Sequence, residues 1–153
     1  MEHITKTVDV PLTPAAAFRI FTRDIAAWWP VDTHSIAAGR GGLPSDLTVE
    51  PHVGGQIYET GENGTRATWA RITRWEDGRA LGLDWHVGRD EAEATRVLVL
   101  FTPVETGTRV DLTHAGFGAM AERAAAMRDN YDTGWDHVLG RCYAGRCGVV
   151  ATA

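Results

Sequence analysis

The sequence predicts an α+β domain in which an antiparallel sheet packs against one long C-terminal helix. Apolar and polar residues alternate in seven short segments separated by turn residues, which is typical of half-buried strands. Near the C-terminus the apolar residues recur at every third or fourth position instead, and such a helix must bury its apolar face on the sheet. We expect residues 1–153 to form a single domain, because a chain of 153 residues has the size of one.

The first strand and two short helices are predicted in the N-terminal part of the chain. Alternation over residues 4–10 predicts a strand. Thr13, which is followed by a proline, is typical of the N-cap of a helix, and the alanine-rich stretch after it continues that helix. A second short helix is expected over 24–30. The glycine-rich segment 31–45 has no period and is predicted to be a loop of about fifteen residues, a length at which loops are often functional.

The rest of the chain predicts a meander of six strands followed by the long helix. From Met120 to Tyr143 apolar residues recur in steps of three and four, which indicates a single helix. Gly134 and Gly140 inside it each cost about 1 kcal/mol relative to alanine, so packing must hold this helix and it can bend there. The six strands are predicted over residues 47–50, 56–60, 67–75, 80–86, 96–102 and 108–114.

Strand alternation also predicts which polar side chains face the core. His114 shares the apolar parity of the last predicted strand, and Glu59 shares that of the strand 56–60. Trp85 faces inward by the same argument, and the helical stripe places Tyr131 and Trp135 on the sheet. We therefore expect Glu59 and His114 to face Trp85 and Trp135.

The strand 67–75 is the one in which alternation does not choose a buried face. Trp69, Arg71 and Trp75 lie on one parity, and Ala70 and Ile72 on the other. Each parity offers apolar side chains to the core, so both assignments stay open.

A carboxylate and an imidazole on buried parities are informative, because burying either group without a partner is costly. One interpretation is that each lies at the rim or is satisfied by nearby protein groups. The other is that they orient the polar end of a ligand in an aromatic-lined apolar cavity. On the second interpretation, we predict eight ligand-binding residues: Trp29, His34, Glu59, Trp69, Trp85, Phe101, His114 and Trp135.

Composition and motifs argue against several classes of function. The net charge of −5 and the absence of adjacent Lys or Arg residues give no footprint for nucleic acid. We find no secretory signal and no stretch of membrane-spanning length, and therefore expect a cytoplasmic protein with no membrane partner. The spacing of Cys142 and Cys147 predicts reduced thiols. The histidines lack the spacing of metal ligands and no nucleotide or hydrolase motif is present, so we predict neither metal nor cofactor.

Several short motifs, in this order and spacing, resemble the SRPBCC (START-like, birch-pollen-allergen-like) superfamily, and more narrowly the bacterial homologues of the activator of heat-shock protein 90 ATPase. The resemblance implies a helix-grip fold, in which a curved antiparallel sheet wraps around the C-terminal helix, with a cavity that admits small apolar molecules. The motifs are Trp29-Pro30 with His34-Ser35, Glu50-Pro51-x-x-Gly54-Gly55, Tyr58-Glu59-x-Gly61, Trp69-x-x-Ile72, Trp85, Thr113-His114-x-Gly116-Phe117 and Gly134-Trp135.

Three functions remain open, because this fold carries many activities. The leading hypothesis is a protein that binds a small hydrophobic or aromatic ligand in the internal cavity. The second is an enzyme of the cyclase or hydrolase kind, with Glu59 or His114 as general acid or base in that cavity. The third is a co-chaperone-like interaction domain, with a homodimer as one arrangement. The predictions favour binding over catalysis.

Overall fold

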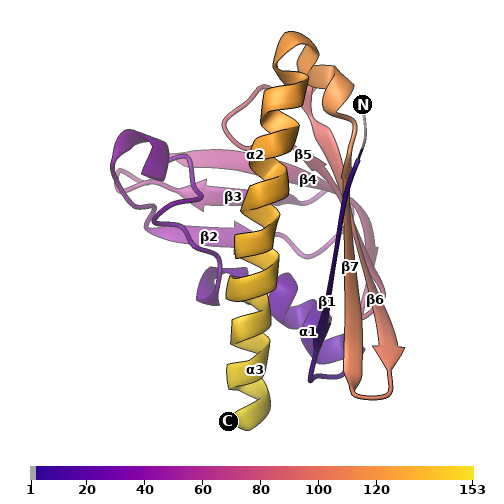
Figure 1. Ribbon diagram of the computed structural model, residues 1–153. Helices are drawn as coiled ribbons and strands as arrows, with labels where there is room; N and C mark the ends of the chain where they lie inside the picture. Colours follow the sequence, from indigo (N-terminus) through magenta and orange to yellow (C-terminus); the bar gives the residue numbers. More distant parts are fainter. Residues whose placement is uncertain (1–2) are drawn as a thin grey trace.

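A computed structural model describes residues 3–153 and confirms the predicted α+β helix-grip fold (Figure 1). An antiparallel sheet of seven strands curls around one long C-terminal helix, which crosses its concave face. The regular elements are β1 (Ile4–Val10), α1 (Pro14–Phe21), β2 (Asp46–Val49), β3 (Gln56–Thr60), β4 (Arg66–Glu76), β5 (Ala80–Trp85), β6 (Thr95–Val104), β7 (Gly107–Ala115), α2 (Ala124–His137) and α3 (Ala144–Thr152).

The strand order in the sheet is β1-β7-β6-β5-β4-β3-β2, so the first strand pairs with the last one. His114 on β7 lies opposite Ile4 on β1 and opposite Val97 on β6, and it is therefore flanked by strands on both sides. Residues directly opposite each other share a face of the sheet. Since Ile4 and Val97 are both buried, the imidazole of His114 also faces the core.

A β-bulge in β4 explains why alternation left the face of this strand undecided. Ala70 pairs with Ile57, whereas Thr68 pairs with the next residue of β3, Tyr58. Two residues of β4 therefore oppose one of β3, and Trp69 is the extra residue. As a result both Trp69 and Ala70 are fully buried, although they are neighbours in the sequence.

A second irregularity in β4 has the same effect three residues later. Ile72 pairs with Leu83 and Trp75 pairs with Leu81, so three steps along β4 match two steps along β5. Ile72 and Trp75 consequently lie on the same face despite their opposite parity. Each of the two parities of β4 therefore contributes buried side chains, because the alternation shifts by one residue at both irregularities.

The N-terminal helix α1 closes the part of the core that is lower in the view of Figure 1. Its N-cap is the predicted one, because the Thr13 hydroxyl accepts a hydrogen bond from Ala16 N at 3.2 Å. Phe18 of α1 packs edge-on against Trp75 and Phe101, with ring centroids 5.0 and 5.2 Å apart. The second predicted helix is one 3₁₀ turn over Ile25–Ala27.

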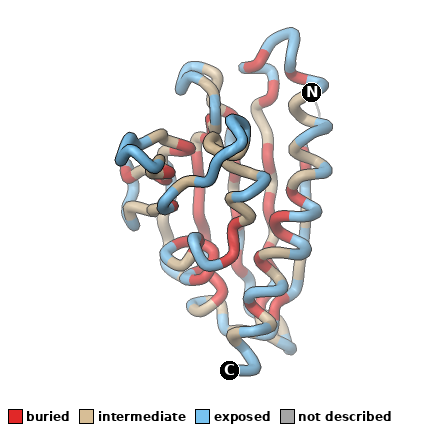
Figure 2. Tube along the Cα trace, turned by 90° about the vertical axis from the view of Figure 1, so that its left-hand side faces the viewer, coloured by how far each residue is buried: buried red, intermediate tan, exposed pale blue. Residues whose placement is uncertain are grey.

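The long C-terminal helix starts later than the sequence predicts and changes its winding midway. A 3₁₀ segment, Phe117–Arg123, comes first, and Ala121 within it has a φ of 51°, which interrupts the helical backbone. The segment Val138–Tyr143, which contains the second predicted weak point, is a π-helix. Figure 2 shows buried residues along the side of the helix that faces the sheet. At Gly140 the helix therefore changes its winding, whereas Gly134 lies within the regular helix α2.

Candidate functional site

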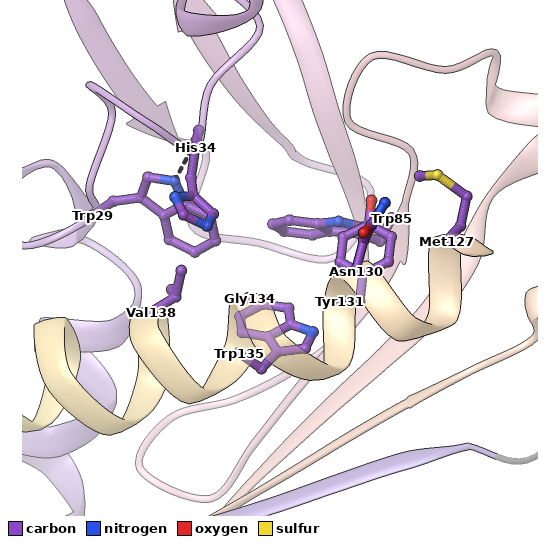
Figure 3. Close-up of a pocket in the computed structure, with 9 residues that line it drawn as sticks. All are labelled: Trp29, His34, Trp85, Met127, Asn130, Tyr131, Gly134, Trp135 and Val138. Atoms are coloured by element: carbon purple, nitrogen blue, oxygen red, sulfur yellow. Dashed lines mark hydrogen bonds between the residues drawn. The ribbon is translucent and has the colours of Figure 1, made fainter. Parts of the chain in front are cut away.

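A cavity of about 270 Å³ lies between α2 and the concave face of the sheet (Figure 3). Its wall is largely apolar and comes from three parts of the chain. These are the segment that follows the 3₁₀ turn Ile25–Ala27, the end of β5, and α2 with the first residue of the π-helix. Nine residues line it: Trp29, His34, Trp85, Met127, Asn130, Tyr131, Gly134, Trp135 and Val138.

Three indole rings, one from each part of the chain, form the core of this wall. The ring centroid of Trp29 lies 5.8 Å from that of Trp85 and 6.0 Å from that of Trp135. The centroids of Trp85 and Trp135 are 5.7 Å apart. None of these three residues is more than 8% exposed. The aromatic faces are therefore shielded from solvent and held by mutual contact.

His34 closes the cavity on the side of the loop 31–45. Its main-chain oxygen accepts a hydrogen bond from Trp29 Nε1 at 2.7 Å, and its Nδ1 lies 2.7 Å from the Thr33 hydroxyl. The ring is stacked at a tilt over His137 of α2, with centroids 5.6 Å apart. Burial lowers the pKa of His34, and the neighbouring His137 acts in the same direction. The imidazole is thus favoured in its neutral form at the edge of an apolar space.

Glu59 is buried as predicted, but its carboxylate does not face Trp85 and Trp135 and does not line the cavity. Its Oε1 accepts hydrogen bonds from Ile36 N at 2.6 Å and Trp69 Nε1 at 2.7 Å. Its Oε2 accepts one from Ala37 N at 3.0 Å. The carboxylate therefore fixes the loop that carries His34 to the sheet.

His114 is fully buried as predicted and lies behind the cavity wall. The Trp135 indole N–H can only donate, so His114 Nδ1 accepts its hydrogen bond, at 3.0 Å. The proton of the neutral ring is then on Nε2, which donates to the Thr95 hydroxyl at 2.6 Å. That hydroxyl donates to the Trp85 main-chain oxygen at 3.2 Å. His114 therefore links two cavity walls from outside the cavity.

The protonation state of His114 follows from this position. Burial lowers its pKa to about 3, and the nearby positive charge of Arg89 contributes in the same direction. The ring is neutral at neutral pH, and both of its nitrogens already have partners. It is consequently unsuited to exchange a proton with a molecule in the cavity.

The two remaining predicted residues lie away from the cavity. Trp69 is fully buried behind Trp29, with ring centroids 5.2 Å apart. Phe101 belongs to the lower core, where it meets Phe18 and Phe21. The structure therefore brings four of the eight predicted residues to the cavity wall: Trp29, His34, Trp85 and Trp135.

Five lining residues were not among the predicted ligand-binding residues: Met127, Asn130, Tyr131, Gly134 and Val138. The signal that would have found them is helical spacing, because residues three, four and seven positions from one wall residue share its face of a helix. Tyr131 was predicted to face the sheet, and Met127, Gly134 and Val138 lie four, three and seven positions from it. Asn130 lies four positions before Gly134.

Three buried side-chain nitrogens have no hydrogen-bond partner in the described part of the chain, and all belong to the segment 85–89: Trp85 Nε1, His86 Nδ1 and Arg89 Nε.

Within residues 3–153, no group of three or more His, Cys, Asp or Glu side chains is arranged to hold a metal ion. No helix in the same range is long and apolar enough to cross a membrane.

The curled sheet, the gripped helix and the cavity between them define the protein as a helix-grip domain of the SRPBCC class. The family model described as activator of Hsp90 ATPase homolog 1-like protein matches residues 11–142. The chain belongs to this family, as its motifs predicted. A comparison with curated proteins gave no match.

Solved structures share this fold. A crystal structure of a protein from Mesorhizobium loti is 14% identical, with a TM-score of 0.66 over 93% of this chain and 94% of that one. The Aha1 dimer from Colwellia psychrerythraea, determined in solution, is 16% identical, with a TM-score of 0.58 over 90% and 96%. A structure described as the anthrahydroquino-γ-pyrone synthase Txn09 is 28% identical, with a TM-score of 0.59 over 86% and 88%.

Proposed function

We propose that this protein binds a small aromatic molecule in the cavity beneath α2. The observation that carries the proposal is the wall of three indoles, Trp29, Trp85 and Trp135, around an apolar space of about 270 Å³. Cavities for drug-sized ligands have volumes of roughly 300–1,000 Å³. A molecule of one or two fused rings therefore suits this space.

The positions of the polar side chains support binding rather than acid–base catalysis by the residues first considered. Glu59 is occupied by three hydrogen-bond donors, and His114 is neutral with both nitrogens engaged. Neither lines the cavity, and His34, which does, is not brought together with them. A general acid or base must come within hydrogen-bond reach of the bound molecule.

A cyclase-type reaction on a bound aromatic molecule is the second candidate, and the likeness to the synthase Txn09 favours it. In this cavity His34 is the imidazole positioned to exchange a proton with such a molecule. Replacing His34 with glutamine tests this candidate. A reaction that depends on His34 would be lost in the variant while binding of the aromatic molecule is retained, whereas unchanged turnover would exclude this role.

Substitution of Gly134 tests the proposed site directly. A side chain at this position enters the cavity, because a Cβ added there would lie 3.8 Å from His34 Nε2 and meet nothing closer. We expect Gly134→Leu to weaken binding of 2-naphthoate and other one- and two-ring aromatics by at least about tenfold, since it occupies their volume. Quenching of tryptophan fluorescence on titration measures the affinity.

Gly145→Leu is the matched control. Gly145 lies on the exposed side of α3, with open space around its Cβ position, so the same substitution changes helix propensity without touching the cavity. We expect its affinity for the aromatic probes to equal that of the wild type. Equal binding by the Gly134→Leu protein, or no binding of any aromatic probe by the wild type, would contradict the proposed function.

A further inference from the structure

The segment 85–89 stands out because its buried polar groups lack partners. Native proteins pair nearly all such groups, so each exception needs a physical explanation. Two of the three unpaired atoms, Trp85 Nε1 and Arg89 Nε, can only donate hydrogen bonds. A group that binds to these two nitrogens must therefore be a hydrogen-bond acceptor.

Arg89 is a half-buried cation that contacts only neutral oxygens. Its Nη1 donates to the main-chain oxygen of Glu93, and its Nη2 donates to the main-chain oxygen of Trp85 at 2.9 Å. Longer contacts of 3.5 and 3.4 Å join Nη2 to the hydroxyls of Thr95 and Tyr131. Among the described residues it makes no ion pair.

The carboxylates that follow Arg89 in the sequence do not neutralise this charge, and that of Glu91 pairs with Arg71. The Glu93 side chain pairs with Arg123, although its main-chain oxygen contacts Arg89. The Asp90 side chain caps the following 3₁₀ turn by accepting from Ala92 N at 2.9 Å. Removing a cation from water without an opposite charge is costly, so this site is electrostatically incomplete.

Arg89 is joined to the cavity through two of its wall residues. It holds the main chain of Trp85 and reaches the hydroxyl of Tyr131, and both residues line the cavity. In the view of Figure 3 the indole nitrogen of Trp85 lies on the side of Tyr131 and Asn130. Because Arg89 donates to the Tyr131 oxygen, the Tyr131 O–H proton is free to point elsewhere.

From this arrangement we infer that the ligand is an aromatic molecule with an anionic oxygen, a carboxylate or a phenolate, held at the Trp85–Tyr131 end of the cavity with its charge balanced by Arg89. The inference rests on the proposed function and narrows its ligand class. The apolar wall receives the rings, whereas the hydroxyl of Tyr131, the amide of Asn130 and the Trp85 N–H receive the oxygen. A hydrogen bond made by an ionised group is stronger than a neutral one, so charge adds both affinity and orientation.

The test compares 2-naphthoate with 2-naphthamide, which has the same rings and nearly the same shape but no charge. We expect the wild-type protein to bind the carboxylate at least about tenfold more tightly at pH 7, by isothermal titration calorimetry. In Arg89→Met, which keeps most of the side-chain length, this preference should disappear while the amide still binds. Arg96→Met removes the same charge from an exposed position of the neighbouring strand, and its preference should equal that of the wild type.

The possible failures are distinguishable. Equal affinity of the wild type for the two probes overturns the inference and leaves the proposed function standing, provided that Gly134→Leu still blocks both. A carboxylate preference that survives in a folded Arg89→Met protein also overturns it. If Arg89→Met does not fold, the Tyr131→Phe protein replaces it, and an undiminished carboxylate preference there counts against the inference. Binding of neither probe contradicts the proposed function itself.

Discussion

Replacing Glu59 with alanine is expected to lower the free energy of unfolding by about 3–4 kcal/mol. The Glu59 carboxylate accepts hydrogen bonds from three donors: Ile36 N, Ala37 N and Trp69 Nε1. The residue is only 3% exposed. Leaving a buried donor unpaired costs about 1–3 kcal/mol, and the free main chain of the loop recovers part of that from water. Urea unfolding followed by tryptophan fluorescence measures the change.

Two further variants make this prediction specific. In Glu59→Gln the amide oxygen keeps two of the three bonds while the amide nitrogen opposes a donor, so the loss should lie between those of the wild type and the alanine variant. Glu62→Ala, at an exposed position of the next turn, should change the free energy of unfolding by less than about 0.5 kcal/mol. An alanine variant as stable as Glu62→Ala would show that the Glu59 hydrogen bonds do not hold the loop.

Acid is expected to destabilise the protein through His114. The unfolded chain binds a proton on this histidine near pH 6.5, whereas in the folded protein burial lowers the pKa to about 3. Between these values the unfolded state binds more protons than the folded one. The free energy of unfolding therefore falls as the pH is lowered from about 6.5 towards 3, by up to about 1.4 kcal/mol per pH unit from this residue.

The measurement is the free energy of unfolding at pH 7, 6, 5 and 4 for the wild type, His114→Leu and His52→Gln. His114→Leu lacks this proton uptake and should show a shallower dependence, although it is less stable at pH 7 because the Trp135 N–H loses its acceptor. His52 is exposed, so its variant should follow the wild-type curve. Imidazole NMR signals of His114 that titrate near pH 6.5 would refute the explanation.

The fold was predictable from the sequence because it depends on periodicities that local residues create. Alternation gave all seven strands and also the inward direction of Glu59 and His114, which are both buried. It did not reveal their partners, since Glu59 accepts from Trp69 of a neighbouring strand, and alternation left the buried face of that strand open. Spatial relations between segments distant in the sequence are not encoded in any local period.

The candidate site was predictable only in part for the same reason. The indoles of the wall could be predicted, because tryptophans at inward positions of a small domain are expected to line either its core or a cavity. Arg89 could not be predicted, since it lies in the connection after β5 and its relation to Tyr131 of α2 arises from the tertiary fold. The position of His34 at the cavity likewise depends on how the loop 31–45, which has no period, is held to the sheet by Glu59.

The π-helical segment Val138–Tyr143 divides the long helix into two parts with separate tasks. Before it, α2 presents Gly134 and Trp135 to the cavity; at its end, Tyr143 is fully buried and donates to the Ala17 oxygen at 2.8 Å in a solid core. We expect substitutions in the first part that do not touch Tyr143 to leave its contacts intact. We therefore expect the cavity of such a domain to tolerate changes in its lining without loss of the packing around Tyr143.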